Sequence, residues 1–150
     1  MSEQNRPDLD TYFIEMAELV SSRSTCKRRK IGAIIVKDKQ VLSTGYNGSP
    51  RGLPHCLDIG CLRDELGIAS GTRHEICRAV HAEQNAIVQC ARHGVPTKTS
   101  ILYVNINPCK ICAKLIINAG ISRVVYRGEY PDNEGIELLK EAGVKVDRIG

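Results

Sequence analysis

Two short sequences decide the fold of this 150-residue chain: HAEQNA at residues 81–86 and PCKIC at residues 108–112. They supply one histidine and two cysteines, which are side chains that Zn²⁺ prefers as ligands. A structural zinc is closed by four protein ligands, whereas three ligands leave the fourth tetrahedral position to water, whose pKa the metal lowers. The set His81, Cys109 and Cys112 therefore predicts a catalytic zinc, and Glu83 beside it is placed to move protons.

Both sequences read as the beginnings of helices. Apolar residues recur at helical spacing from Val80 to Arg92, and a second helix is predicted from Pro108 to about Asn118, closed by Gly120. Cys109 and Cys112 share one face of that helix, near an N-terminus whose positive end of the dipole stabilises thiolates. Two helix starts that face each other would bring the three ligands together.

Other interpretations explain only half of this pattern. C-x-x-C can be half of a zinc ribbon or a redox pair, and a lone H-x-E occurs by chance. A ribbon needs a second C-x-x-C, which this chain lacks, and a redox pair has no use for His81 and Glu83. The open zinc site is the interpretation that uses both halves.

Composition predicts one domain over residues 1–150, located in the cytoplasm. No apolar run reaches membrane-spanning length, and the polar first ten residues do not resemble a signal peptide. Seven cysteines without such a signal favour reduced thiols and metal ligands over disulfides. The formal charge of +4 suits anionic ligands, while the single basic cluster 27–30 is typical of a solvated surface and makes nucleic acid an unlikely partner.

Hydrophobic periodicity predicts an α/β fold: a three-layer α/β/α sandwich around a mixed five-stranded sheet. Beyond the two motif helices, helices are expected near 8–21 and 133–142. The expected strands are 31–37, 41–46, 101–105, 123–127 and 145–149. The first two strands form an antiparallel hairpin across the polar turn 38–40, and the others are expected to be parallel with right-handed crossovers. A long irregular insertion rich in Cys and His, at about 47–77, remains.

The chain resembles the deoxycytidylate (dCMP) deaminases, a branch of the cytidine deaminase-like zinc deaminase superfamily. H-x-E with P-C-x-x-C identifies the superfamily. The loop GYNGSP at 45–50 and the Cys/His-rich insertion resemble the dCMP branch, and the similarity runs from SRSTC at 22–26 to Tyr130. The resemblance implies hydrolytic deamination of dCMP to dUMP and ammonia, a step of pyrimidine nucleotide biosynthesis that supplies thymidylate synthesis. Glu83 would carry one proton from the zinc-activated water to N3 of the cytosine and would then deliver a second proton to the departing amine.

The resemblance also implies substrate contacts. It assigns Asn47 to the sugar and base, and Ala82 and Tyr130 to the same site, although Asn47-Gly48 is equally explained as a turn and Tyr130 as a surface residue. Arg23 and Arg28 are candidates for the 5′-phosphate, but solvated basic residues are common.

The remaining cysteines suggest a second, structural zinc, as in some relatives. The expected ligands are Cys26, Cys56, Cys61 and Cys77, with His74 as the alternative for either of the last two. Buried free thiols are the other explanation, and Cys90 in the middle of a helix fits that description.

Relatives of this type are often hexamers that dCTP activates and dTTP inhibits, and Mg²⁺ accompanies such triphosphates. The resemblance places effectors at Gly45, Asn47, Gly48 and Arg92, although an arginine at a helix C-terminus also interacts with the dipole. Two alternatives stay open. One is a zinc deaminase for cytidine, dCTP, tRNA adenosine or a pterin- or riboflavin-type base. The other is a nucleotide sensor without catalysis, against which the intact Glu83 argues.

Overall fold

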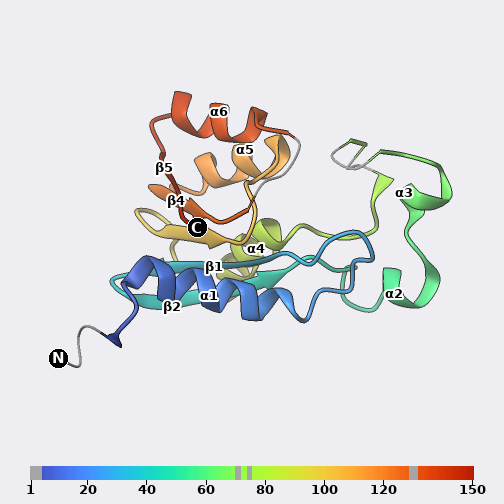
Figure 1. The fold of residues 1–150 in the computed structure, drawn as a ribbon, viewed down its shortest axis with the longest axis horizontal. Helices are drawn as coiled ribbons and strands as arrows, with labels where there is room; N and C mark the ends of the chain where they lie inside the picture. The colour runs from blue at the N-terminus through green and yellow to red at the C-terminus, as the bar shows by residue number, and fades with distance from the viewer. Residues whose placement is uncertain (1–4, 70–71, 74–75, 129–131) are drawn as a thin grey trace.

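The computed structural model describes residues 5–69, 72–73, 76–128 and 132–150, and these residues fold around one five-stranded sheet (Figure 1). The strand order is β2-β1-β3-β4-β5. The strands are β1 (Gly32–Lys37), β2 (Gln40–Tyr46), β3 (Ile101–Val104), β4 (Arg123–Tyr126) and β5 (Lys145–Arg148).

The sheet is mixed, as the sequence predicts. β1 pairs antiparallel with both β2 and β3, whereas β3, β4 and β5 are parallel to one another. The β1–β2 hairpin closes through Asp38 and Lys39, whose φ angles of 51° and 63° are both left-handed. Two such residues give the turn a twist that matches the right-handed twist of the strands.

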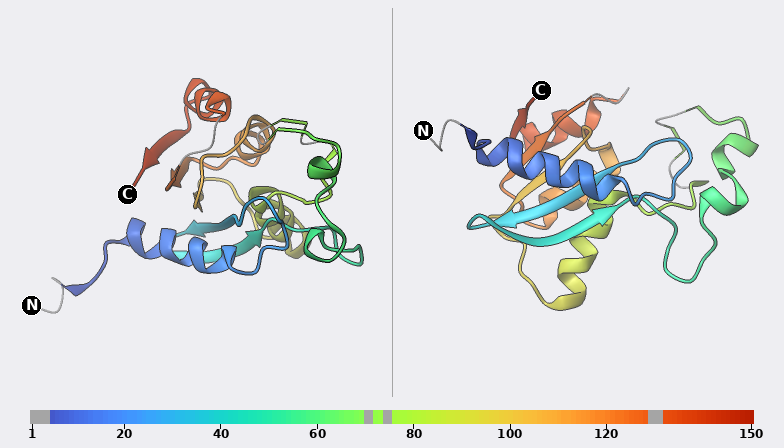
Figure 2. Two further views of the ribbon diagram at one scale, coloured as in Figure 1. Left: turned by 45° about the vertical axis from the view of Figure 1, so that its right-hand side comes forward. Right: turned by 60° about the horizontal axis from the view of Figure 1, so that its bottom comes forward.

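Helices cover both faces of the sheet and make the predicted three layers (Figure 2). Helix α1 (Leu9–Ser21) packs alone on one face. The opposite face carries α4 (Ala82–His93), α5 (Lys110–Asn118) and α6 (Glu134–Glu141). With 13 residues, α1 is the longest helix in the described residues, and none there has the length and apolar character to span a bilayer.

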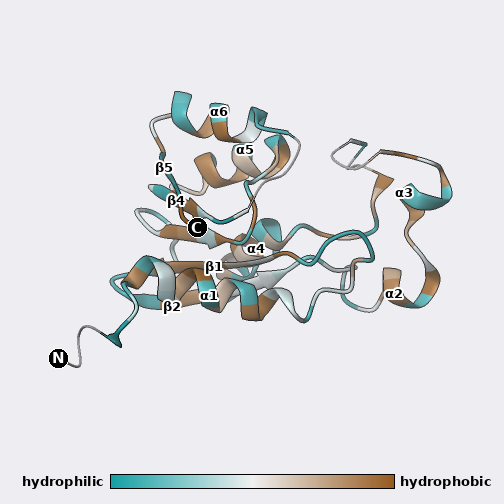
Figure 3. Ribbon diagram, in the orientation of Figure 1, coloured by the Kyte–Doolittle hydropathy of each residue, from teal (hydrophilic) through white to brown (hydrophobic). Residues whose placement is uncertain are grey.

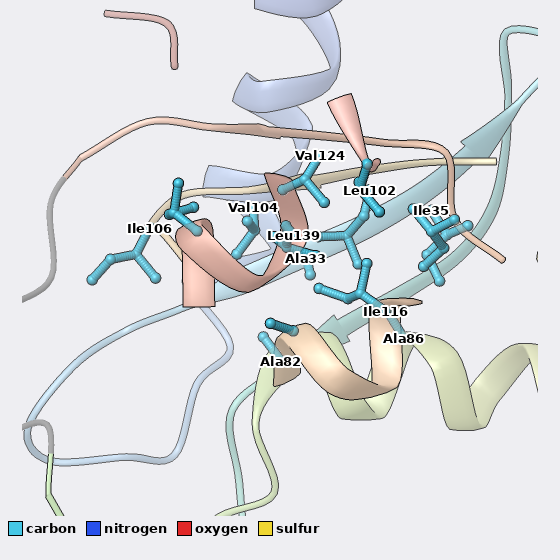
Figure 4. Packing of buried hydrophobic residues seen from close by; sticks show 14 of the residues in the cluster. Ala33, Ile35, Ala82, Ala86, Leu102, Val104, Ile106, Ile116, Val124 and Leu139 are labelled. Atoms are coloured by element: carbon cyan, nitrogen blue, oxygen red, sulfur yellow. The ribbon is translucent and has the colours of Figure 1, made fainter. Parts of the chain in front are cut away.

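Side chains alternate between the two faces of the central strands and so pack against both helix layers. Ile34 and Val36 face α1, while Ala33 and Ile35 face the three-helix layer, and β3 divides in the same way. Figure 4 shows the second set of side chains meeting those of the helices, and these strands are correspondingly hydrophobic in Figure 3. Because both faces are buried, the strands are nearly continuous apolar runs.

The two motif helices begin slightly later than predicted. His81 is the N-cap of α4 and Cys109 is the N-cap of α5, so Pro108 precedes the cap and does not open the helix. His81 and Cys109 consequently occupy helix caps, where the chain is still extended and can direct a side chain across the helix end, while Cys112 lies in the first turn of α5.

The insertion contains two short helices that hydrophobic periodicity did not predict: α2 (Cys56–Ile59) and α3 (Leu62–Glu65). It projects from one end of the sheet, at the right of Figure 1. A bridge between Gly48 and Val80 ties its two ends together, with Val80 N donating to Gly48 O at 2.7 Å. The insertion therefore starts and finishes beside the beginning of α4.

Candidate active site

The three predicted zinc ligands meet where α4 and α5 begin. His81 Nδ1 lies 3.2 Å from Cys112 Sγ and 3.4 Å from Cys109 Sγ. All three ligand atoms lie within 4.8 Å of one another. Tetrahedral zinc, with bonds of about 2.0–2.3 Å, holds its ligand atoms about 3.4–3.8 Å apart. The donors and their spacing fit zinc.

The two cysteines are polarised by each other. The hydrogen bond from Cys112, followed by that from His81, lowers the pKa of Cys109 to about 3 despite burial. The same contact, together with burial, raises the pKa of Cys112. A cation bound between the sulfur atoms of Cys109 and Cys112 would stabilise both side chains as thiolates.

His81 is held by its neighbours on α4. Its backbone N–H donates to Oε1 of Gln84 at 2.8 Å, which fixes the first turn of the helix. Burial opposes protonation of the ring, but the hydrogen bond with Cys109 and the charge of Glu83 outweigh it and raise the pKa of His81.

Glu83 lines a pocket together with His81 and Cys109, but it is not part of the ligand cluster. Its side chain is buried, with the residue only 3% exposed, and burial raises its pKa above the usual carboxyl value although His81 opposes the shift. A buried carboxyl group next to a metal site, and not bound to it, is suited to accept and return a proton.

Two close approaches of the backbone hold the ligand helices in place. A Cβ atom on Gly45 would lie 2.4 Å from Ala82 O and 2.5 Å from Ala86 N, so only glycine lets α4 pack this closely on β2. Gly135 at the start of α6 plays the same part for the loop before α5, since a Cβ there would lie 2.2 Å from Pro108 O. Sequence reasoning assigned Gly45 to effector binding, whereas its contacts in the structure are with α4.

The pocket over the cluster joins residues distant in the chain. Asn47 is buried in its wall, where Oδ1 accepts from Ile31 N and Nδ2 donates to Arg29 O. Asn47 and Gly48 do not form the turn that was the alternative interpretation, because Gly48 pairs with Val80 in a bridge. The Asn47 side chain instead binds the segment before β1 and lines the pocket. Other wall residues are Cys26, Arg28, Arg63, Cys77, Ala79, Ile106 and Asn107.

Three arginines make this wall basic. Arg28, Arg29 and Arg63 all line the pocket, and Arg63 is only 6% exposed. Arg28 donates from Nε to Asp64 at 2.7 Å and bonds Ile68 O, while its buried Nη1 has no hydrogen-bond partner among the described residues. Arg23, the other phosphate candidate, is exposed and is not part of the wall.

Of the two remaining substrate candidates, only Ala82 is among the described residues. The Ala82 side chain is packed in the core cluster and is not part of the pocket wall. Tyr130 falls outside the described residues. Sequence reasoning missed Arg29, Arg63 and Asn107. The position of Asn107 shortly after the end of β3 was an available signal, because ligands bind beyond the carboxyl ends of sheet strands.

The second set of cysteines does not form a cluster at ligand spacing. Cys26, Cys56 and Cys61 are buried and Cys77 is half-buried. Burial, followed by the charges of Cys26, Cys77 and Cys61, raises the pKa of Cys56. Among the described residues, however, only the three catalytic ligands form a group whose ligand atoms all lie within 4.8 Å of one another, and His74 lies outside those residues. Four thiols have the donor chemistry of a closed zinc site.

The remaining effector candidates lie on a separate surface hollow. Gly48 and Arg92 line it together with Tyr46, Arg51 and Asn85. Asn47 points to the zinc pocket and does not line this hollow.

Residues 7–127 match the model of the cytidine and deoxycytidylate deaminase zinc-binding region. Deoxycytidylate deaminase of Schizosaccharomyces pombe is 39% identical over 142 residues, which are 94% of this chain and 44% of that protein. Deoxycytidylate deaminase of Mycobacterium phage D29 is 43% identical over 130 residues, 83% of this chain and 98% of that protein. The chain thus spans less than half of the yeast relative and nearly all of the phage relative.

A solved structure with a similar fold is the dCMP deaminase of the cyanophage S-TIM5 in complex with dCMP and dUMP. It is 36% identical, has a TM-score of 0.82, and the match covers 96% of this chain and 98% of that one.

Proposed function

The chain belongs to the cytidine and deoxycytidylate deaminase family, and we propose from this that it converts dCMP and water into dUMP and ammonia. The observation that carries the proposal is a single pocket whose wall contains His81, Cys109 and Glu83 at one side and three arginines at another. The first group suits attack on an amino-pyrimidine, and the second suits a phosphate.

His81, Cys109 and Cys112 would hold Zn²⁺, which supplies a water of lowered pKa and stabilises negative charge on its oxygen. Glu83 accepts the proton of that water and delivers it to N3 of the cytosine as the oxygen bonds to C4. Glu83 then carries the second proton of that water to the amino group, so that the C4–N4 bond breaks and ammonia leaves. The buried position of Glu83 keeps this proton away from bulk water.

The arginines of the basic wall would bind the 5′-phosphate of the substrate. Arg28 and Arg63 are anchored on the insertion through Asp64 and through Thr72 O, so their guanidinium groups are ordered before a ligand arrives. Charge-assisted hydrogen bonds from fixed arginines favour the monophosphate over the nucleoside. Asn47 and Asn107 are the amides of the wall best placed for the sugar and base.

Ammonia release from dCMP, CMP, dCTP, cytidine and deoxycytidine tests the proposal. We expect kcat/KM to be highest for dCMP. Equal values for dCMP and deoxycytidine would exclude a phosphate-reading pocket, and no release from any of the five would favour the sensor without catalysis.

We further propose a structural zinc held by Cys26, Cys56, Cys61 and Cys77, with His74 as a substitute ligand. Support comes from the donor chemistry of the four thiols, three of which are buried, and from the scarcity of apolar packing in the insertion.

By the same resemblance we propose a cytoplasmic homo-oligomer, a hexamer, regulated by dCTP and dTTP with Mg²⁺. The hollow lined by Gly48 and Arg92 is the surface we assign to these effectors. Native mass spectrometry and activity measurements with each triphosphate test the assembly and the regulation separately.

A further inference from the structure

The three residues before β1 belong to the pocket wall although they lie outside the strand. β1 begins at Gly32, and two of the residues that precede it, Arg29 and Ile31, line the pocket together with His81 and Glu83. Residues 29–31 are not part of a regular strand pair. Whatever holds these residues therefore decides where Arg29 and Ile31 meet a ligand.

Asn47 holds one edge of this segment. β2 ends at Tyr46, which lies opposite Gly32, so Asn47 is the next residue along that edge. Its backbone N–H donates to Ile31 O at 3.2 Å, and its side-chain Oδ1 accepts from Ile31 N at 2.9 Å. Its Nδ2 donates to Arg29 O at 2.8 Å. The side-chain amide thus takes the place of a neighbouring strand.

Asn105 holds the opposite edge in the same way. β3 ends at Val104, which lies opposite Ala33, so Asn105 is the next residue along this second edge. Its backbone N–H donates to Gly32 O at 3.3 Å, and its side-chain Oδ1 accepts from Gly32 N at 2.9 Å. Its Nδ2 donates to Lys30 O at 3.1 Å. The two amides therefore repeat one pattern on the two sides of one segment.

Together the two amides continue the ladder of β1 backwards along the chain. Alternate residues bind to alternate sides, as in the middle strand of a sheet, and the carbonyl groups of residues 29–32 all have a partner. Side chains of an extended segment also alternate between faces. Ile31 and Ala33 pack with the layer of α4 and α5, so Arg29 is directed to the same face, where the catalytic ligands lie.

We infer that Asn105 is a positioning residue for nucleotide recognition, which holds Arg29 in the basic wall by binding residues 30 and 32. This inference rests on the proposed function. Asn105 lines a neighbouring hollow and acts on the pocket only through the segment that it binds. Asn47 differs from it in lining the pocket directly, so only Asn105 separates positioning of the wall from contact with the ligand.

The expected consequence is selective, because the two ends of the pocket are held by different parts of the fold. His81, Glu83 and Cys109 are positioned by α4 and α5, which pack in the core cluster. Arg29 depends on the two amides. The bond from Asn105 to Lys30 O is exposed, so water can replace it and the fold survives its loss. Removing the Asn105 amide should therefore weaken phosphate binding and leave base binding nearly unchanged.

The test uses Asn105→Ala, with Asn118→Ala as matched control, since Asn118 is exposed at the end of α5. Calorimetry measures the dissociation constants of dUMP and deoxyuridine. We expect Asn105→Ala to weaken dUMP about tenfold and deoxyuridine by less than about threefold, as for the partial loss of a charge-assisted contact. Asn118→Ala should keep both values. Equal loss for the two ligands, or no loss for dUMP, would overturn the inference.

A double-mutant cycle with Arg29→Gln tests whether Asn105 acts through Arg29. Arg29→Gln should itself weaken dUMP more than deoxyuridine. Adding Asn105→Ala to it should then weaken dUMP by less than about threefold further, because both substitutions remove the same contact. Two losses that multiply in full, or unchanged dUMP affinity in Arg29→Gln, would contradict the inference. Should Asn105→Ala fail to fold, Asn105→Ser replaces it in the cycle, since its shorter side chain carries one oxygen in place of the two amide atoms.

The same measurements separate this inference from the proposed function. Equal affinity of the wild-type protein for dUMP and deoxyuridine would refute the phosphate-binding pocket, and this inference with it. A wild-type preference for dUMP that survives Asn105→Ala would overturn the inference alone. Binding is measured without turnover, so a protein that binds dUMP but is inactive on dCMP would refute the proposed reaction and leave the test of Asn105 intact.

Discussion

Gly135 packs directly on the backbone of Cys109, because a Cβ atom on Gly135 would lie 2.8 Å from the Cys109 carbonyl carbon and carbonyl oxygen. One helix that carries no ligand thus fixes the position of a loop that carries one. The catalytic set depends on packing at a distance from the pocket, and this dependence can be tested.

Gly135→Ala is expected to destabilise the protein by about 1–3 kcal/mol, since the added methyl group meets backbone atoms that cannot rotate away. Zinc affinity should fall with it, because the loop that holds Cys109 must shift. Urea unfolding and zinc content measure the two effects. The control is Glu137→Ala, an exposed substitution on the same helix. Wild-type stability in Gly135→Ala would contradict the packing argument.

Glu83→Gln is expected to keep its zinc and to lose at least about 10²-fold in kcat, the lower range for a positioned acid–base group. The amide has nearly the same shape, but it cannot accept and return the proton. Steady-state kinetics on dCMP with parallel zinc analysis provide the measurement. Near wild-type turnover in a zinc-replete preparation would rule out Glu83 as the proton carrier.

Arg63→Gln should reduce kcat/KM for dCMP about tenfold or more and change that for deoxycytidine little, because only the nucleotide carries the phosphate. Arg23→Gln is the matched control, since Arg23 is exposed and outside the pocket wall. Initial rates with both substrates give the ratio. If both substrates lose equally in Arg63→Gln, the arginine serves the fold and not the phosphate.

The catalytic ligands could be predicted from the sequence, whereas Arg28 was the only arginine of the basic wall that could be named from it. Zinc chemistry demands particular residue types at fixed spacing, so His81, Cys109 and Cys112 stand out without coordinates. A phosphate demands only positive charge from any direction. Twenty-one Lys and Arg residues compete for that role, and the choice of Arg63 over Arg23 depends on how the insertion folds back.

The same contrast applies to the fold. Strands and long helices follow from periodic burial, and the predicted layers and mixed sheet are confirmed. Helices α2 and α3 lack that signal because each has only four residues and neither packs an apolar face into the core clusters; Leu57 N of α2 donates to Thr25 O, and Asp64 of α3 binds Arg28. Helix starts were misplaced by about two residues, since His81 and Cys109 serve as N-caps and Pro108 lies before the cap.

Asp10→Asn should reduce stability at neutral pH by about 1 kcal/mol, a value that allows for partial exposure of the ion pair. Arg123 donates to both oxygens of Asp10 at 2.9 and 2.8 Å, and this hydrogen bonding lowers the pKa of Asp10 below its usual 3.8 despite burial. A lowered carboxyl pKa stabilises the fold above the unfolded value and loses this effect as the pH falls through the folded value. The difference between wild type and variant should therefore shrink below about pH 4.

Urea unfolding between pH 7 and pH 2.5 measures that difference, with Glu141→Gln, an exposed carboxyl change, as control. A constant difference across this range would mean that Asp10 contributes by packing and not by charge.

The last prediction separates the two metal sites by phenotype. Wild-type protein purified without chelator should contain close to two zinc ions per chain. Cys56→Ser should lose one of them, melt at a lower temperature and expose the segment 47–73 to proteolysis, because a closed zinc site contributes folding free energy directly. Cys109→Ser should lose the other ion and chiefly abolish turnover, since the core clusters hold α4 and α5 independently of the metal. Metal analysis, thermal unfolding and limited trypsin digestion give the three readouts. One zinc per wild-type chain, with Cys56→Ser as stable and as protease-resistant as wild type, would show that the four thiols are ordinary buried cysteines and that arginine contacts alone hold the insertion against the pocket.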